Sequence, residues 1–294
     1  MNPSTAPVPL FVLHWNRPDE CLRTVEAFLE QDYPLQVHVI DNASEDAALQ
    51  ALREKLPDSV KVRRLDENKG WGPALNVVLS EWLSSCQSEF CFISAHDAMP
   101  GEHCIRMLVE SMNADPRIGI ASPEYGTSEI PCFDSLRYLR SKPVERRRNG
   151  TAEAVDVPHG TLMLLRKTCL ADIGLFDERY FAYGDEHELG LRAGLHHWKV
   201  ALVWGAVVVN PGTWTASSTR SYLFARNSLL LVRTYGGRWP AALRFLLMIP
   251  NTLRMLLMSP DKHYAFSARA RFTAMGDFLF SRYGPPPPLR RPGR

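Results

Sequence analysis

Apolar runs alternate with amphipathic stretches over the first 122 residues, and this alternation constrains the fold more than any other feature of the chain. Five runs have the length and composition of buried strands, at residues 9–15, 35–44, 60–66, 90–94 and 117–122. Apolar residues at helical spacing follow them at 16–31, 45–56, 72–85 and 101–114. This succession predicts an α/β fold with a Rossmann-like, mostly parallel central sheet flanked by helices on both faces.

Ligands bind such sheets where the parallel strands end, so four loops form the candidate site, at 14–18, 41–46, 67–73 and 95–101. In the first two loops, Asn16 is a polar candidate, Asp41 can accept a hydrogen bond from a nucleotide base, and Asn42 and Ser44 can reach a ribose. The run Asp-Asn-Ala-Ser is also a good helix entry with Ser44 as the capping residue, so plain turn chemistry is an equal alternative.

The loop at 67–73, ENKGWGP, places two glycines and a lysine before a helix that begins with Pro73. Such a backbone suits the close approach of a phosphate or sugar, which makes Asn68, Gly70 and Trp71 candidates. The loop is neither a Walker loop nor a G-x-G-x-x-G fingerprint, so the pattern does not favour an ATP-cleaving or nicotinamide enzyme.

The loop at 95–101 begins directly after an apolar run and contains Asp97, with His96 beside it. A carboxylate at this edge can bind Mg²⁺ or Mn²⁺, which prefer oxygen ligands and often bridge to a diphosphate. The alternative is that Asp97 caps the helix that begins near Gly101.

An aromatic turn at 176–183 leads into the acidic run Asp185-Glu186-His187-Glu188 at a helix start. The helix dipole favours ionised carboxylates there, so Asp185 and Glu186 are both candidates for a general base. The alternative is an acidic N-terminal cap in which Glu188 pairs with Arg192.

The segment 123–156 shows fading periodicity and is expected to be a long loop or lid over the site. Its basic run, Arg146–Arg148, is expected on a solvated face, with a diphosphate or membrane contact as the alternative. His159 follows, and an ordinary position at the edge of the core is expected for it, with proximity to the acceptor as the alternative.

The charge of the chain is unevenly distributed. Residues 220–294 hold 13 Lys and Arg but two Asp, a net charge of +11, which leaves −9 for residues 1–219. We therefore expect a body at 1–219, a basic helical extension at 220–284 and a disordered tail at 285–294. The extension is too interrupted to span a bilayer, and it suits either an anionic membrane surface or packing on the body or on a second subunit, as in a homodimer.

The six cysteines show no metal or disulfide spacing, and the N-terminus lacks the pattern of a signal peptide. We expect a cytoplasmic protein with reduced thiols. If the extension binds lipid, we expect the protein to be peripheral on the inner face of the cell membrane. A nucleic-acid partner is not expected.

Eight stretches resemble, in order, those of the family 2 glycosyltransferases with a GT-A fold, especially the rhamnosyltransferase-like branch. They cover about the first 230 residues: HWNRPDE, VIDNASED, ENKGWGPALN, FISAHDAMP, VDVPHGTLMLLRK, FDERYFAYGDEHELGLRAG, VVVNPG and YLFARNSLLL. The resemblance implies that Asp41 and its neighbours hold the nucleotide base, that Asn68, Gly70 and Asn76 shape the donor pocket, and that Asp97 faces a metal-bound diphosphate.

The chain departs from the family pattern at three places. Asp185-Glu186-His187-Glu188 stands where E-D-x-D is typical, so Glu186 falls at the position of the base while Asp185 remains a candidate. Ala95 replaces the first residue of the D-x-D-like element, and Asn210 replaces a frequent metal-binding His. Dependence on Mg²⁺ or Mn²⁺ is therefore expected to be weak, or His96 contributes.

The expected activity is transfer of a sugar, with inversion, from a dTDP-rhamnose, another dTDP-deoxysugar or a UDP-sugar. The acceptor is expected to be a hydroxyl of a glycan, a lipid-linked sugar or a natural product. A non-catalytic scaffold with a docking tail is the alternative, kept open by Ala95 and Asn210. A sugar nucleotidyltransferase is a weaker one, because the loop at 14–18 lacks the basic, glycine-rich character that a triphosphate requires.

Overall fold

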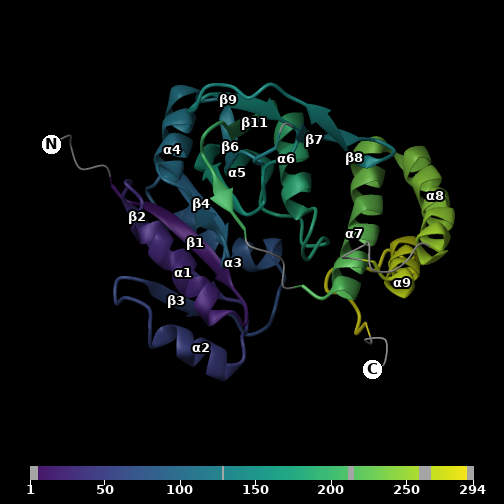
Figure 1. The fold of residues 1–294 in the computed structure, drawn as a ribbon, viewed down its shortest axis with the longest axis horizontal. Coiled ribbons are helices and arrows are strands. Elements are labelled where there is room, and N and C mark those ends of the chain that lie inside the picture. The colour runs from purple at the N-terminus through teal and green to yellow at the C-terminus, as the bar shows by residue number, and fades with distance from the viewer. Residues whose placement is uncertain (1–5, 128, 211–214, 258–265, 290–294) are drawn as a thin grey trace.

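The structure is a computed structural model that describes residues 6–127, 129–210, 215–257 and 266–289. Its centre is an eight-stranded sheet in the order β3-β2-β1-β4-β10-β6-β11-β9 (Figure 1). All neighbouring pairs are parallel except those of β10 with β4 and β6 and of β9 with β11. The strands are β1 (Val8–His14), β2 (Leu35–Asp41), β3 (Lys61–Arg64), β4 (Phe90–Ala95), β6 (Ile118–Pro123), β9 (Ala152–Val155), β10 (Leu162–Arg166) and β11 (Lys199–Val203). The mostly parallel sheet expected from the alternation is confirmed.

Helices cover both faces of this sheet. One face carries α1 (Pro18–Leu29), α2 (Asp46–Arg53) and α4 (Cys104–Ala114), which contribute to one apolar cluster. The other carries α3 (Gly72–Ser85), α5 (Lys167–Ile173) and α6 (Asp185–Leu195), which contribute to a second. The two-sided cover explains why the strands read as continuous apolar runs, since both faces of each strand are buried.

The segment 123–156, expected to be a loop or lid, contains regular structure. A hairpin of β7 (Glu129–Asp134) and β8 (Tyr138–Pro143) is followed by β9, which pairs antiparallel with β11 at the sheet edge. The period-2 signal is weak because most of the hairpin's side chains are partly or fully exposed.

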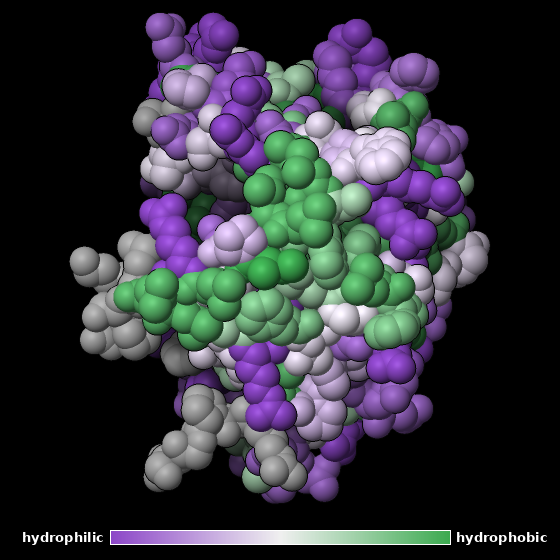
Figure 2. Space-filling model, turned by 90° about the vertical axis from the view of Figure 1, so that its right-hand side faces the viewer, coloured by the Kyte–Doolittle hydropathy of each residue, from purple (hydrophilic) through white to green (hydrophobic). Residues whose placement is uncertain are grey.

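The C-terminal part consists of helices, as expected. They are α7 (Ser217–Leu231), a π-helical turn η1 (Val232–Gly236), α8 (Arg238–Leu257) and α9 (Ala268–Leu279). α7 is buried along most of its length and packs against α9, whereas α8 presents apolar residues on the face shown in Figure 2. Within the described ranges, no helix combines the length and apolarity needed to cross a bilayer.

Two of the expected terminal features fall partly outside the described residues. Of the stretch VVVNPG, residues 211 and 212 are not described, and of the tail expected to be disordered, residues 290–294 are not. Pro285, at the start of that tail, lines a cavity together with Asn68.

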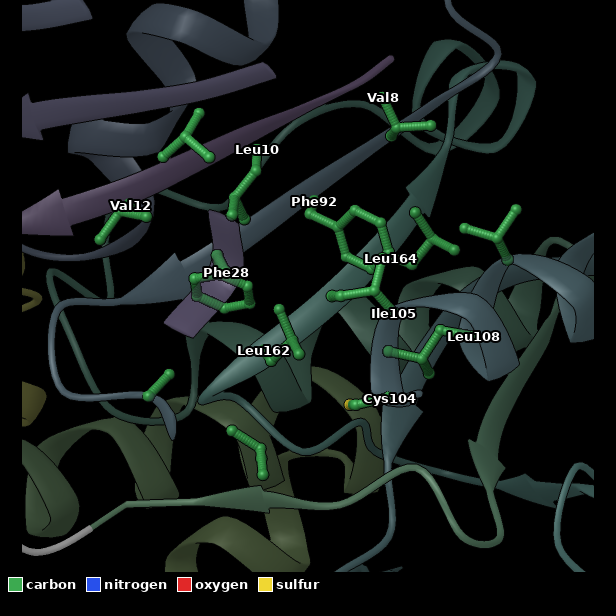
Figure 3. Close-up of a cluster of buried hydrophobic side chains, with 14 of the residues drawn as sticks. Val8, Leu10, Val12, Phe28, Phe92, Cys104, Ile105, Leu108, Leu162 and Leu164 are labelled. Atoms are coloured by element: carbon green, nitrogen blue, oxygen red, sulfur yellow. The ribbon is translucent and has the colours of Figure 1, made fainter. Parts of the chain in front are cut away.

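Side chains of alternate residues in β1 point to opposite faces of the sheet. Val8, Leu10 and Val12 point to the α1/α4 face, where they meet Phe92 of β4 and Leu164 of β10 (Figure 3). Phe11 and Leu13 enter the other cluster. Because β1 is held from both sides, the polar residues at its carboxyl end are placed rigidly.

Candidate functional site

The carboxyl ends of β1 and β2 are joined side by side by polar contacts. Strand pairing sets His14 opposite Asp41, and His14 Nδ1 lies 2.9 Å from Asp41 Oδ1. The other carboxylate oxygen, Oδ2, accepts the backbone N–H of Ser44 at 3.2 Å. Burial acts to raise the pKa of Asp41, but the bonds from His14 and Ser44 outweigh it, so the pKa is lowered. Asp41 is therefore an ionised, fully buried carboxylate at this edge.

Ser44 and Asn16 link the first two loops to each other. Ser44 Oγ accepts the backbone N–H of Asn16 at 2.8 Å, and Asn16 Oδ1 accepts that of Glu45 at 2.7 Å. Ser44 does not cap α2, because Glu45 is the N-cap residue and no side chain caps that helix. The expected capping role of Ser44 is thus wrong, since its hydroxyl is already used between loops.

Asn42 holds the third loop in place. Its amide donates to Asn68 Oδ1 at 3.1 Å and to the Gly70 carbonyl at 2.8 Å, and its oxygen accepts the Lys69 N–H at 2.9 Å. Gly70 has φ +89°, and a Cβ there would lie 2.1 Å from the carbonyl oxygen of Phe181. The loop is therefore fixed against the turn that precedes α6, and Trp71 N–H donates to that same oxygen at 2.6 Å.

Asn76 lies in the first turns of α3, and its side chain contacts the segment before α6. Its side chain donates to the Phe176 carbonyl at 2.9 Å and accepts the Phe176 N–H at 3.0 Å, so both of its polar ends are used. It borders a cavity of about 640 Å³ together with Asn68. Asp41, Asp97 and Glu186 do not line that cavity. Asn76 thus ties α3 to the chain before α6.

Asp97 and Asn210 meet although 113 residues separate them. The antiparallel pair of β5 (Met99–Pro100) and β12 (Val208–Val209) brings the two together, and the amide of Asn210 donates to Asp97 Oδ1 at 3.2 Å. Burial raises the pKa of Asp97 to about 6. Asp97 does not cap α4, which begins at Cys104 without a side-chain cap.

His96 points from the same loop toward β1. Its Nδ1 lies 3.2 Å from the carbonyl oxygen of Leu13, and its ring contacts that of His14 with centroids 6.0 Å apart. Burial lowers the pKa of His96 to about 4, so the ring is neutral at physiological pH. Because Nδ1 donates to Leu13, Nε2 carries a lone pair, and this buried atom has no hydrogen-bond partner.

Asp185 and Glu186 begin α6 after Gly184, whose φ of +94° only glycine adopts readily. Asp185 is completely buried, and its Oδ2 accepts the N–H of Gly72 at 2.9 Å. Burial and the charge of Glu186 raise the pKa of Asp185 well above its ordinary value, so Asp185 carries the proton. It serves to bind α6 to the start of α3.

Glu186 differs from its neighbour in exposure and charge. Its side chain is 18% exposed, and its Oε2 accepts the N–H of Gly184 at 3.0 Å. Burial alone would raise the pKa of Glu186, but His187, whose Nε2 lies 3.6 Å away, and hydrogen bonds outweigh it, so the pKa is lowered. The expected pair of Glu188 and Arg192 also forms, at 2.7 Å, and leaves Glu186 without an arginine or lysine partner among the ion pairs of the described residues.

Residues 160–161 lie between the loop that carries Asp97 and the start of α6. The backbone N–H of Ala95, which ends β4, donates to the Thr161 carbonyl at 3.0 Å. A Cβ on the adjacent Gly160 would lie 3.0 Å from Glu186 Cγ, so the loop that carries Asp97 and the start of α6 flank the same short segment.

Comparison with known proteins decides the family. The model of glycosyl transferase family 2 matches residues 10–174, which is more than half of the chain. This chain belongs to glycosyl transferase family 2. Its fold is GT-A, and within the family it is rhamnosyltransferase-like, as the sequence motifs indicated.

Relatives of this family 2 glycosyltransferase include a Mycobacterium tuberculosis N-acetylglucosaminyl-diphospho-decaprenol L-rhamnosyltransferase, 25% identical over 78% of this chain and 85% of that protein. The structure resembles that of the mannosyltransferase PcManGT from Pyrobaculum calidifontis in complex with GDP-Man and Mn²⁺. Identity is 18%, the TM-score is 0.60, and 94% of this chain and 87% of that chain are covered. GalNAc-T7 with UDP, GalNAc and Mn²⁺ gives a TM-score of 0.64 at 14% identity, over 96% of this chain and 58% of that one.

The residues of this glycosyltransferase fit a divalent cation in part. Asp97 and Asn210 offer oxygen ligands, which Mg²⁺ and Mn²⁺ prefer, and a cation would offset the burial that raises the pKa of Asp97. Among the described residues, no group of three or more His, Cys, Asp or Glu side chains could hold a metal. The remaining ligands would then come from a diphosphate and water.

Two side chains beside Glu186 were missed or given another role in the sequence analysis. Tyr138, from the start of β8, places its hydroxyl 2.5 Å from His187 Nδ1. His159 was expected at the edge of the core, but it lies close enough to Glu186 for that charge to act on its pKa, which burial lowers. The dipeptide His159-Gly160 was a usable signal for this site, whereas nothing local marked Tyr138.

Proposed function

We propose that this glycosyltransferase is an inverting enzyme in which Glu186 is the general base. The acceptor hydroxyl gives its proton to Glu186 while its oxygen forms a bond to the anomeric carbon of the donor. The bond from that carbon to the diphosphate breaks at the same time, and the electron pair leaves with the diphosphate. A single displacement of this kind inverts the anomeric configuration.

The proposal rests on the difference in burial and charge between the adjacent carboxylates of Asp185 and Glu186. Asp185 is buried and protonated and is bonded to the N–H of Gly72, so it is not available as a second catalytic carboxylate. Glu186 is ionised and partly exposed. One available base supports single displacement rather than a covalent glycosyl intermediate.

We place the donor at the edge formed by Asn16, Asp41, Asn42 and Ser44, with the diphosphate toward Asp97. Asp97 and Asn210 would hold Mg²⁺ or Mn²⁺, which would neutralise charge on the leaving diphosphate. His96 presents its unpartnered Nε2 from the same loop and can accept a hydrogen bond from a donor hydroxyl. The similarity to a rhamnosyltransferase supports a dTDP-deoxysugar donor, and that relative's name supports a lipid-linked sugar as acceptor.

Replacing each carboxylate by its amide tests the base. Glu186→Gln is expected to lower turnover by about two to four orders of magnitude with donor binding retained. Asp185→Asn is the matched control and should stay within about tenfold of wild type, because the amide oxygen can still accept the Gly72 N–H. Product configuration is read by NMR. Near-normal turnover of Glu186→Gln, or retention of configuration, would refute the assignment.

Donor class can be screened by thermal stabilisation with dTDP-, UDP- and GDP-sugars, with and without Mn²⁺. Stabilisation by one class of nucleotide sugar, followed by transfer or hydrolysis of that sugar, supports the proposed enzymatic activity. Binding without any turnover would favour the non-catalytic scaffold instead.

A further inference from the structure

Helix α8 carries apolar side chains on the face turned away from the protein. Trp239 is 87% exposed and Leu257 is 89% exposed. We call the exposed apolar residues of this helix the α8 ridge: Trp239, Leu243, Leu246, Leu247, Leu253, Leu256 and Leu257. Figure 2 shows apolar side chains gathered in a continuous band on this side of the molecule. Such a patch marks an interaction surface.

The opposite side of α8 is packed against the protein. Ala241, Met248 and Thr252 are buried there, and the first two belong to the cluster shared by α7, α8 and α9. Most ridge residues recur at spacings of three and four, so they form one stripe about 30 Å long. A helix apolar on both sides is ordinarily buried on both, so the ridge lacks a contact that its composition requires.

The charges around the ridge indicate what that contact is. Between Ser217 and Leu257 the sequence holds no Asp or Glu. Arg238 and Arg254, both exposed, lie at the two ends of α8, and Arg233 is exposed in the turn before it. Asp277 of α9 is bonded to Tyr222 and lies 3.8 Å from Arg282, so its charge is offset. The surroundings of the ridge are therefore positive.

We infer that the α8 ridge docks on an anionic lipid bilayer, with α8 lying in the plane of the interface. The leucines and Trp239 enter the boundary between headgroups and acyl chains, while the flanking arginines meet lipid phosphates. A second copy of the chain fits less well, because a symmetric dimer would bring the same arginines of both copies together without acidic partners.

The position of α8 leaves the catalytic edge accessible. α8 lies at one end of the long axis of the molecule, while β1, β2 and β3 lie toward the other end (Figure 1). Docking through α8 thus leaves the expected donor-binding loops free, and the hairpin and α6 lie between the two regions. The inference does not depend on the proposed donor, base or acceptor.

Vesicle flotation of the full chain tests it. The probes are vesicles of phosphatidylcholine alone and of phosphatidylcholine mixed with phosphatidylglycerol. We compare wild type with the double variant Leu246→Glu/Leu253→Glu. The matched control is Leu195→Glu at the end of α6, where the leucine is 68% exposed but lies outside the ridge.

Wild type and Leu195→Glu are expected to float with the anionic vesicles, less at high salt, and weakly with phosphatidylcholine alone. Partitioning of the double variant should fall at least about tenfold, since two charges replace two inserted leucines. Thermal unfolding checks that the variants are folded. Transfer to a water-soluble acceptor, measured on the same samples, reports the proposed activity separately.

Two results would overturn the inference. One is failure of the wild type to float, or equal flotation of the double variant. The other is a wild-type dimer, seen by size exclusion, that the double variant converts to a monomer without any change in flotation, which would make the ridge a contact between copies.

Discussion

At the scale of single residues, neighbouring acidic side chains differ in protonation and in exposure because their surroundings differ. Asp185 and Glu186 are consecutive, yet only Asp185 is cut off from solvent and bonded to Gly72. Like charges in contact cannot both stay ionised at low cost, so one proton stays on the more buried group. Glu186 is left ionised, which supports its proposed role as the base.

Tyr138 completes the arrangement at this scale. Burial raises the pKa of its hydroxyl well above the ordinary value, so the hydroxyl stays protonated where it meets His187 Nδ1. The other ring nitrogen of His187, Nε2, faces Glu186 at 3.6 Å. Tyr138 is therefore a positioning residue for the side chain next to the base.

Asp97→Asn should stabilise the protein while it impairs metal binding. Burial raises the pKa of Asp97 from 3.8 to about 6, so the folded state holds this charge at a cost above pH 6. The amide removes the cost, and we expect a gain of about 2–3 kcal/mol in the free energy of unfolding at pH 7.5 without added metal. The cost develops as pH rises from about 4 to 6, so the gain should shrink toward pH 4.

Urea unfolding at several pH values measures this gain, and donor binding with and without Mn²⁺ measures the loss of cation dependence. A variant that is less stable than wild type at pH 7.5, or that keeps the full Mn²⁺ effect, would contradict the prediction.

At the scale of elements, asparagine side chains join segments that are distant in the sequence. Asn42 fixes the loop before α3, Asn76 fixes the chain before α6, and Asn210 meets Asp97. Asn227 of α7 donates to the carbonyl oxygens of Tyr180, Ala182 and Tyr183 at 2.8–2.9 Å. An amide suits this role because it can donate twice and accept at the same end, which matches free backbone groups in a turn.

Asn227→Ala should destabilise the fold and also slow the reaction. It leaves the carbonyls of the turn before α6 without their donor, and we expect a loss of about 2–4 kcal/mol in the free energy of unfolding. Turnover should fall as well, because that turn sets the position of Glu186. Asn251→Ala, at an exposed position of α8, is the control and should cost about 0.5 kcal/mol or less. Equal unfolding midpoints for the two variants would count against this role of Asn227.

At the scale of the whole molecule, the C-terminal helices share a core with the catalytic body. Tyr180, from the turn before α6, and Tyr138, from the hairpin, belong to the same apolar cluster as Leu229 of α7 and Phe278 of α9. Arg226 and Arg244 are turned inward, where they donate to backbone carbonyls of Tyr180 and Leu136. Part of the basic character of this region therefore serves internal contacts, and the exposed arginines remain for the surface.

A chain that ends at Asn210 should not fold to the native state. Removal of α7 exposes the cluster around Tyr180 and removes the donors of Arg226 and Asn227, so near-UV circular dichroism should be lost and the urea midpoint should fall or vanish. A chain lacking only residues 290–294 controls for shortening and should match wild type. A cooperative transition of the truncated chain at the wild-type midpoint would show that residues 1–210 are an independent domain.

Much of the fold could be predicted because buried strands and helices require apolar residues at a regular spacing along the sequence. The strand expected at 9–15 is β1 (Val8–His14), and the helix expected at 72–85 is α3 (Gly72–Ser85). The hairpin of β7 and β8 left no such pattern, because only Ile130 and Tyr138 are buried and the other side chains are partly or fully exposed. Of the candidate site, the residue types in the four loops could be predicted, but the engagement of Asn76 by the backbone of Phe176 could not.

The sequence by itself determined the α/β architecture, the family and the position of the acidic pair, because periodicity and short motifs depend on neighbours along the chain. Only the tertiary structure decided that Glu186 rather than Asp185 is ionised and partly exposed, that Tyr138 contacts His187, and that one face of α8 is left uncovered. Burial of Asp185 and partial exposure of Glu186 depend on groups that approach through space, such as Gly72 and Gly160, which are tens of residues away along the chain.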